Sequence, residues 1–302
     1  MDFVKQERKV GRFLLLDGHA YAYRAFFAIR ELNGPDGQPT NAIFGFTKML
    51  QKLQDNLKPT HVLVVWDAGL DGLRTQLLPE YKAQRPVTPS ALESQFPQIQ
   101  KFLRAAGVAG ISVEGIEADD LIASYAVAAA SAEMDVVIAS SDKDFMQLVG
   151  SSIRLSNPGD KSDRLWAEAE VKEKTSVSPN QIVDYLSLLG DSVDNIDGIP
   201  GVGPKTASEL LNTFGSIDSI LNNIANIPSS RIRAAVDTRR DILKRNRELI
   251  SLRLDLSLPL VIDDCRVGAT DISELSGLYL KWGFNTMRRE LESRLVSQPV
   301  LL

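Results

Sequence analysis

The sequence predicts an α/β protein in which a central, mainly parallel sheet is flanked by helices and followed by a helical region. Short apolar runs such as 13–16 and 61–66 are typical of buried strands, and the segments between such runs show helical spacing. Strands that alternate with helices favour parallel pairing with right-handed crossovers. Strand signals stop at the turn sequence 157–160. We therefore predict two regions, residues 1–175 and residues 176–302.

The expected elements follow one another at intervals that suit this architecture. The predicted strands are 13–16, 61–66, 111–113, 136–139 and 153–155. Apolar residues at three- and four-residue intervals predict helices at 21–29, 42–57, 90–106 and 181–189, and from 118 onwards. The glycine-rich segment 198–207 is expected to lead into a further helix that runs through 214. Parallel strands place their carboxyl ends at one edge of the sheet, and ligands bind outside that edge. Side chains that follow these strands are therefore expected to converge.

Composition and charge limit the class of protein. The 302 residues, 44% hydrophobic and 24% charged, are enough for two regions with apolar cores. No apolar run approaches the roughly 20 residues of a membrane span, and residues 1–7 lack a signal-peptide core, so no membrane association is expected. The single cysteine, Cys265, excludes an internal disulfide and favours a reducing, cytoplasmic setting. The net charge of −5 still allows a local basic face, because clustered acids would mask it.

Carboxylates gather at the predicted strand ends and at the start of one helix. Acids in a first helical turn favour the helix dipole, which is one explanation for those near residue 118. A cluster of like charges, however, raises the pKa values of its members and is unfavourable unless a cation compensates. The same chain offers too few nitrogen and sulfur ligands for zinc, whereas oxygen ligands favour Mg²⁺ or Mn²⁺ first and Ca²⁺ second. The acids concerned are Asp17, Asp67, Glu117, Asp119, Asp120, Asp142 and Asp144.

Residues 68–107 interrupt the alternation of strands and helices. The spacing suggests a long excursion over the mouth of the sheet, with basic side chains in its first half. Lys82 and Arg85 are three residues apart, so they share one face if the segment is helical, although Pro86 disfavours helix at Arg85. A solvated loop is the alternative.

The segment 198–207 is rich in glycine and leads into a helix. A nucleotide-binding P-loop requires lysine directly after the last glycine, but Pro204 stands there and no strand precedes the segment. A helix, a glycine hairpin and a second helix with outward first-turn amides instead predict a site for phosphate backbones. Gly203 is expected to allow close approach of a phosphate and to need a positive φ. The basic stretch 231–247 reads either as a solvated helical face or as a further DNA contact.

Seven motifs together resemble the 5′–3′ exonuclease and flap endonuclease family, and within it most resemble the N-terminal exonuclease domains of bacterial DNA polymerases I. They occur in family order from about Phe13 to Phe284. His19, where small polar residues are usual, and Trp66, where phenylalanine is common, are departures that remove no acid. The motifs are Asp17-Gly18, Val65-Trp66-Asp67, Tyr81-Lys82-Ala83-Gln84-Arg85-Pro86, Glu117-Ala118-Asp119-Asp120, Ser141-Asp142-Lys143-Asp144, Gly190-Asp191-Ser192-Val193-Asp194-Asn195 and Gly201-Val202-Gly203-Pro204-Lys205-Thr206-Ala207.

The resemblance implies a resolvase-like (PIN-like) nuclease core with a helical arch at about 68–107 and a helix-hairpin-helix at about 180–215. It implies nine metal ligands, which are Asp17, Asp67, Glu117, Asp119, Asp120, Asp142, Asp144, Asp191 and Asp194. It also assigns Lys82, Arg85 and Arg24 as basic residues near the scissile phosphate and Tyr81 as a candidate stacking residue. The implied DNA-binding residues are Gly201, Val202, Gly203, Lys205 and Thr206.

The activity implied by the resemblance is metal-dependent hydrolysis of DNA at the 5′ ends of nicks, gaps and flaps, in replication and repair. Two Mg²⁺ ions, with Mn²⁺ able to substitute, would take part in an in-line displacement that leaves a 5′-phosphate. Relatives also suggest a K⁺ ion at the hairpin. We expect a monomer whose partner is DNA and which stands alone or is linked to a DNA polymerase; the sequence leaves that choice open.

Two other functions fit parts of the sequence. A related ribonuclease would use an acidic pocket on a similar sheet, but it would need fewer carboxylates and no glycine hairpin. A junction-binding module that does not cut would keep the hairpin, but it would gain nothing from nine acids beside a polyanion. Cleavage of a flap duplex, with an RNA control, separates these functions.

Overall fold

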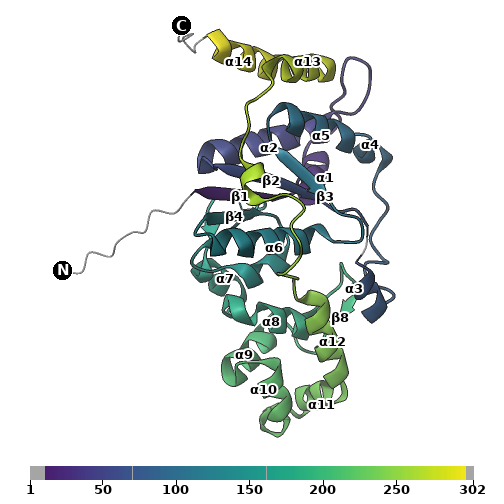
Figure 1. The fold of residues 1–302 in the computed structure, drawn as a ribbon. Helices are drawn as coiled ribbons and strands as arrows, with labels where there is room; N and C mark the ends of the chain where they lie inside the picture. Colours follow the sequence, from purple (N-terminus) through teal and green to yellow (C-terminus); the bar gives the residue numbers. More distant parts are fainter. Residues whose placement is uncertain (1–10, 70, 161, 297–302) are drawn as a thin grey trace, which may run out of the picture.

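The structure is a computed structural model that describes residues 11–69, 71–160 and 162–296. A six-stranded sheet with the order β3-β2-β1-β4-β5-β6 lies at its centre, and a helical region extends from one side of it (Figure 1). The first five strands in this order are parallel, and β6 is antiparallel to β5. The predicted sheet is confirmed. The strands are β1 (Arg12–Asp17), β2 (His61–Trp66), β3 (Ala109–Ser112), β4 (Asp135–Ala139), β5 (Ile153–Ser156) and β6 (Leu165–Trp166).

Both faces of the sheet are covered by helices, and this explains why the central strands read as unbroken apolar runs. Phe13 and Leu15 of β1 belong to one core, together with α6 (Ala118–Ser131). Leu14 and Leu16 belong to the core on the opposite face. The helices of that second face are α1 (Gly18–Ala28), α2 (Asn41–Leu57) and α5 (Phe96–Ala105).

The segment 68–107 is only partly helical. It contains α3 (Gly72–Leu77), turns at 79–84 and the short α4 (Ser90–Glu93) before α5, whose Ile99 and Phe102 are buried in the core. Lys82 lies in a turn with φ of 56° and Arg85 lies outside any helix. Of the two alternatives left open by the sequence, a shared helical face does not occur, and the proline after Arg85 disfavours helix at that residue.

The helical region continues the core of the α6 face. Val177, Leu186 and Leu243 share that core with Phe13, so the region is packed onto the sheet domain. The hairpin follows α8 and leads into α9. Between β4 and the end of α12 the elements other than the sheet strands β5 and β6 are η1 (Lys143–Leu148), α7 (Glu168–Thr175), η2 (Pro179–Gln181), α8 (Ile182–Leu189), β7 (Gly190–Asp191), β8 (Ile196–Asp197), α9 (Pro204–Phe214), α10 (Ile217–Asn222), η3 (Ile224–Asn226), α11 (Ser230–Thr238) and α12 (Arg240–Ile250).

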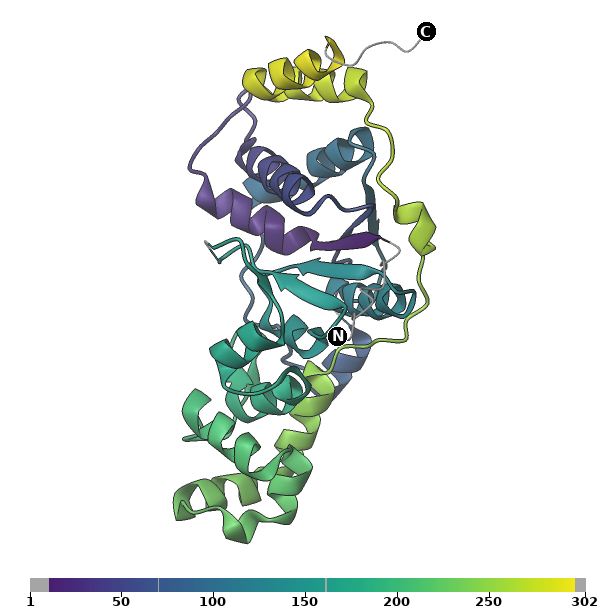
Figure 2. The same cartoon turned by 90° about the vertical axis from the view of Figure 1, so that its left-hand side faces the viewer.

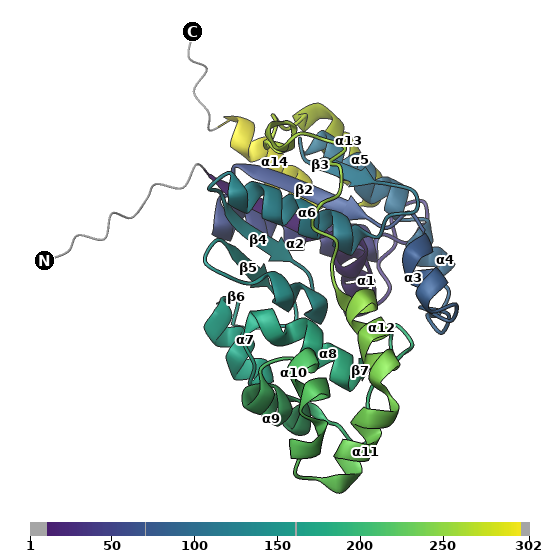
Figure 3. The same ribbon diagram turned by 60° about the horizontal axis from the view of Figure 1, so that its bottom comes forward.

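After α12 the chain returns across the sheet domain instead of staying with the helical region. The segment 251–271, which includes η4 (Ile262–Cys265), crosses α6 and follows one side of the molecule (Figures 2 and 3). Ser124 and Tyr125 of α6 donate hydrogen bonds to backbone carbonyls of this segment, at 3.0 and 2.9 Å. Polar side chains of the helix thus hold an otherwise irregular backbone in place.

The last two helices lie at the end of the molecule opposite the hairpin (Figure 1). They are α13 (Ile272–Trp282) and α14 (Asn285–Val296), and their Tyr279 and Trp282 are buried in the α2/α5 core. The prediction that 176–302 form a single helical DNA-binding region does not hold for this pair. Within residues 11–69, 71–160 and 162–296, no helix combines the length and the apolar character that a membrane crossing requires.

Candidate metal centre and DNA interface

The ends of the parallel strands position the first acids. Asp17 is the last residue of β1, and its two carboxylate oxygens accept hydrogen bonds from Ala20 N at 2.9 Å and from Ser140 Oγ at 3.0 Å. Asp67 follows β2 and accepts from Ala118 N at 2.8 Å, so it caps α6 from a neighbouring strand. Capping residues satisfy amides that the first helical turn leaves unpaired. The sheet register and these caps together fix Asp17 and Asp67 at one edge.

The loop after β4 and the loop after α8 bring further acids to this edge. Asp142 accepts from Asp144 N at 2.9 Å and thereby caps η1. Asp191, the last residue of β7, accepts from Val193 N at 2.8 Å in the turn that follows. Together with the sheet acids these residues form what we call the acidic cluster: Asp17, Asp67, Glu117, Asp119, Asp142, Asp144, Asp191 and Asp194.

The acids of this cluster repel one another. Burial raises the pKa of Asp17 to about 6, and the neighbouring charge of Asp67 adds to the rise. Burial and then the charge of Asp142 raise the pKa of Asp119, and also that of Asp144, well above the ordinary range. A protein that gathers so many carboxylates in one place carries a local excess of negative charge that a cation would relieve.

The donor atoms fit a hard divalent cation. Glu117 Oε1 and Asp144 Oδ1 are buried without a hydrogen-bond partner, which is costly for a carboxylate unless another ligand satisfies it. The clustered donors are all carboxylate oxygens, the type that Mg²⁺ and Mn²⁺ prefer. Among the described residues, no three His, Cys, Asp or Glu side chains are placed so that together they could hold a metal ion. The fit therefore rests on donor chemistry and charge.

Cationic side chains already balance part of this charge. Lys82 Nζ lies 2.8 Å from Glu117 Oε2, and the lysine side chain is almost wholly buried. Arg85 binds Asp194 at 2.6 Å. Lys143, which the sequence analysis did not single out, binds Asp191 at 2.9 Å. In the sequence, only the position of Lys143 between Asp142 and Asp144 could have indicated that it lies at the acidic cluster. The basic side chains of 81–85 therefore lie at the acidic cluster, as expected for groups that meet a phosphate there.

The glycine hairpin lies between β8 and α9, a few residues after the cluster acids Asp191 and Asp194. Gly201 has φ of 83°, and a Cβ added there would lie 2.6 Å from the guanidinium of Arg231. Gly203 has φ of −100° and open space around it, so the expectation of a positive φ was wrong for Gly203 and applies to Gly201. Lys205 is 90% exposed in the first turn of α9, whereas Val202 is buried and offers only its backbone.

Family comparisons agree with this geometry. Residues 12–176 match the family model described as "5'-3' exonuclease, N-terminal resolvase-like domain", and residues 177–273 match "5'-3' exonuclease, C-terminal SAM fold". The chain belongs to the 5′–3′ exonuclease family. A 5′–3′ exonuclease of Aquifex aeolicus (strain VF5) is 36% identical over 278 residues, which cover 92% of this chain and 94% of that protein.

Members of the family differ in length. DNA polymerase I of Bacillus caldotenax is 35% identical over 284 residues, 93% of this chain but 32% of the polymerase, so this chain spans about a third of that relative. The bacteriophage T5 flap endonuclease, solved with DNA and metal ions, superposes with a TM-score of 0.65 at 20% identity and covers 93% of this chain and 98% of that one. That similarity shows a shared fold.

The structure corrects the prediction for one of the nine acids of the exonuclease motifs. Asp120 is fully buried, and its two oxygens accept hydrogen bonds from Arg74 at 2.6 and 2.9 Å. One of these oxygens also accepts from Arg253 N at 2.9 Å. Successive helical residues point about 100° apart, so Asp120 faces the interior while Asp119 faces the acidic cluster. Asp120 is therefore a partner of Arg74 rather than a member of the cluster.

The other predicted residues of the motifs have mixed outcomes. Tyr81 is buried, and its hydroxyl donates to Glu117 Oε2 at 3.2 Å, so its ring is not available for stacking on a base. Arg24 is exposed and lines a surface pocket of about 490 Å³ that also includes Ser141, the neighbour of Asp142. This places a basic residue beside the acidic cluster. Thr206 is half-buried at the start of α9.

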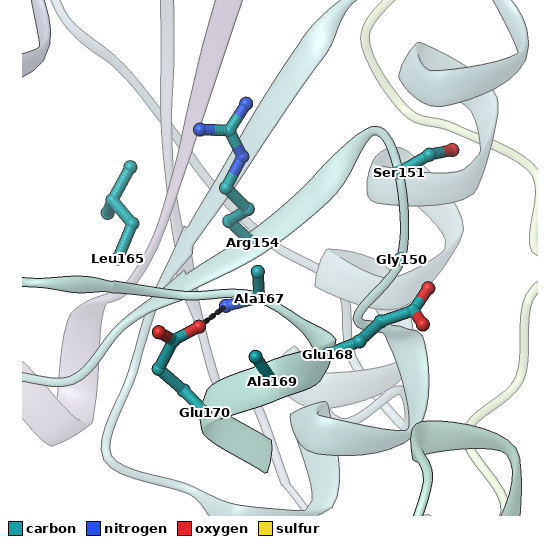
Figure 4. Close-up of a pocket in the computed structure, with 8 residues that line it drawn as sticks. All are labelled: Gly150, Ser151, Arg154, Leu165, Ala167, Glu168, Ala169 and Glu170. Atoms are coloured by element: carbon teal, nitrogen blue, oxygen red, sulfur yellow. Dashed lines mark hydrogen bonds between the residues drawn. The ribbon is translucent and has the colours of Figure 1, made fainter. Parts of the chain in front are cut away.

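Another pocket, of about 540 Å³, lies away from the acidic cluster, between β5, β6 and the start of α7 (Figure 4). Two of its polar side chains, Arg154 and Glu170, are already engaged. Arg154 binds Asp135 at 2.9 Å, and Glu170 accepts from Ala167 N at 2.8 Å within its own helix. We therefore assign no part of the nuclease site to this pocket.

The raised pKa of Asp17 predicts a pH-dependent stability difference. An acid with a higher pKa in the folded state binds its proton more tightly there, so its contribution to stability is lost as pH rises from about 4 to about 6. We therefore expect Asp17→Asn, in chelator, to melt at nearly the wild-type temperature at pH 4 and above it at pH 7. The two pKa units correspond to about 3 kcal/mol at most. Equal melting temperatures at pH 7 would contradict the raised pKa.

Proposed function

We propose that this chain is a structure-specific 5′–3′ exonuclease and 5′-flap endonuclease that hydrolyses DNA phosphodiester bonds in replication and repair. The observation that carries the proposal is the acidic cluster, because its mutually repelling acids and unpartnered buried oxygens are unfavourable without divalent cations. Family membership supports it, as does the name of the Aquifex aeolicus relative. The glycine hairpin, which follows β7 and β8 and so comes soon after the cluster acids Asp191 and Asp194, supplies a second surface for DNA.

We place two Mg²⁺ ions, which Mn²⁺ can replace, at the eight carboxylates of the acidic cluster. When bound, the ions supply activation of water and stabilisation of the leaving oxygen in an in-line displacement. Support for metal dependence comes from the T5 flap endonuclease, which was solved with metal ions. The products would be a 5′-phosphate and a 3′-hydroxyl.

In this proposal, the two basic residues near the 79–84 turn, Lys82 and Arg85, hold the scissile phosphate. Lys82 and Arg85 now donate to Glu117 and Asp194, so they already lie among the acids that would bind metal. A phosphodiester that enters the cluster offers oxygens of the same charge, and the two cations would donate to these oxygens instead. Fixed donors aimed at developing charge stabilise a transition state more than the ground state. Arg24, beside Ser141, would orient the strand that leads to the cut.

The hairpin has the role of holding the duplex part of the substrate. The first-turn amides of α9 and the exposed Lys205 are suited to phosphates, and backbone contacts position a protein without reading sequence. We include in the proposal a K⁺ ion at the hairpin, a monomeric state and a cytoplasmic location. A DNA polymerase, linked or separate, is the proposed functional partner, because the polymerase relatives are about three times as long as this chain.

The test of the function is cleavage of a labelled 5′-flap duplex, with Mg²⁺ and with chelator, beside a single-stranded RNA of the same sequence. We expect cuts at the flap junction only with Mg²⁺ and little attack on the RNA. Cleavage of the RNA in preference to the flap would identify a ribonuclease instead. Tight junction binding without any cleavage would identify a binding module.

A second prediction concerns Lys205. Lys205→Ala should weaken binding about equally for flap duplexes of unrelated sequence and should lower the slope of log K against log salt by roughly 1, the value for one lost phosphate contact. Binding titrations at three salt concentrations measure this slope. Lys101→Ala is the matched control, because Lys101 is exposed on α5 away from the hairpin. An unchanged slope for Lys205→Ala would move the duplex contact to the arginines after 231.

A further inference from the structure

Arg74 is a buried arginine that joins three parts of the chain: α3, the start of α6 and the end of α12. It lies on α3, with 5% of its surface exposed, and its three guanidinium nitrogens all donate hydrogen bonds. Two of the nitrogens bind Asp120 of α6, as described above, and one of these also lies 3.3 Å from Glu117 Oε2. The third, Nε, donates to Leu249 O at 2.9 Å, and Ser251 O accepts from the guanidinium at 3.2 Å.

Arg74 neutralises the buried carboxylates that surround it. Asp71, Glu117 and Asp120 are each at most 3% exposed, and all three lie within 3.4 Å of the same guanidinium nitrogen. Buried carboxylates are costly by several kcal/mol each unless a paired cation and hydrogen bonds compensate. A planar guanidinium meets a carboxylate through two parallel hydrogen bonds, and lysine cannot reproduce that geometry.

The contact of Arg74 with Asp120 lies in the first turn of α6. Glu117, the residue before this helix, makes no capping hydrogen bond with its side chain. Its Oε2 accepts from Lys82 and Arg74 while Oε1 has no partner. Because Asp119 and Asp120 are adjacent on one helical turn, fixing Asp120 on the interior side fixes the direction of Asp119 towards the acidic cluster.

We propose that Arg74 is a positioning residue for divalent metal binding, which holds Glu117 directly and Asp119 through Asp120, and which ties the end of α12 to the same turn. The inference rests on the proposed function for its biological meaning. Outer-shell partners of metal ligands orient the ligands, and their loss typically costs about 10- to 100-fold in metal affinity or activity. Arg74 touches no ion or substrate in this role.

The test compares Arg74→Lys with Arg12→Lys. Arg12 is a matched control, because it also binds a carboxylate, Asp135, at 2.7 Å and a backbone carbonyl, that of Leu57, at 2.7 Å, but at the opposite end of β1. Calorimetric titration with Mn²⁺ alone should show an affinity about 10-fold or more lower for Arg74→Lys and unchanged for Arg12→Lys. Melting temperatures in chelator should fall for both variants. Wild-type Mn²⁺ affinity in a folded Arg74→Lys would overturn the proposal.

A second variant keeps the test decisive if Arg74→Lys does not fold. Asp120→Asn keeps the shape of the side chain but loses its charge, and its loss of Mn²⁺ affinity should be smaller than that of Asp119→Asn. A loss as large as that of Asp119→Asn would make Asp120 itself a ligand and overturn the positioning role. Because the titration contains no DNA, normal Mn²⁺ binding by a wild-type protein that fails to cleave flaps would contradict the proposed function and leave this inference standing.

Discussion

Replacement of Asp119 or Asp142 by asparagine is expected to abolish cleavage while leaving the affinity for a flap junction close to the wild-type value. Each substitution removes a charge from the acidic cluster but no proposed contact with DNA. Outer-shell substitutions at metal sites cost up to about 100-fold, and loss of a ligand should cost at least as much. Single-turnover cleavage at saturating Mg²⁺ and binding titrations in chelator measure the two quantities separately.

These substitutions should lower activity but raise the stability of the metal-free protein. Asp119 has a pKa raised by burial and by the charge of Asp142, so Asp119→Asn should raise the melting temperature of the metal-free protein at pH 7. Asp135→Asn is the matched control, because Asp135 is buried in the same sheet and binds Arg12 and Arg154. This control should lower stability and retain cleavage. Retention of a tenth or more of wild-type turnover by Asp119→Asn would count against the metal assignment.

Lys82→Ala and Arg85→Ala are expected to lower kcat far more than they raise the Kd for substrate. Both side chains pair with proposed metal ligands of the acidic cluster. In the proposed reaction, charge would develop on the phosphate at this place. Removing one preorganised donor from such a position typically costs about 100- to 1000-fold in kcat. Single-turnover rates and equilibrium binding, measured for each variant, give the comparison.

The control for these variants is Gln84→Ala in the same turn. Gln84 is uncharged and donates to Asn195 Oδ1 at 3.0 Å, so its loss perturbs the contact between the turn and the hairpin loop without removing a cation. We expect a change of less than about 10-fold, the scale of one neutral hydrogen bond. Equal losses in kcat and in affinity for Lys82→Ala and Arg85→Ala would make the two cations ordinary binding residues.

The sequence by itself determined the parallel sheet and the acids at its carboxyl edge. Runs such as 61–66 are apolar because both faces of the sheet are covered, and the chain direction places Asp17 and Asp67 together once the strands are parallel. The hairpin was equally evident, because glycine and proline mark turns locally. These features depend on neighbours in sequence or on the general geometry of parallel strands, and both are visible without coordinates.

Only the tertiary structure decided which side chains face one another. Asp120 shares a motif with Asp119, but its partner is Arg74, 46 residues away in sequence, and no local pattern identifies that pairing. Tyr81 is buried for the same reason, because its neighbour Glu117 comes from a distant segment. The chain returns along α6 and carries α13 and α14 to the far end. Along this path the Tyr125 hydroxyl donates a hydrogen bond to Leu260 O and accepts one from Leu260 N. Periodicity predicts which face of an element is buried, whereas the partner of a buried charge depends on how distant segments pack together.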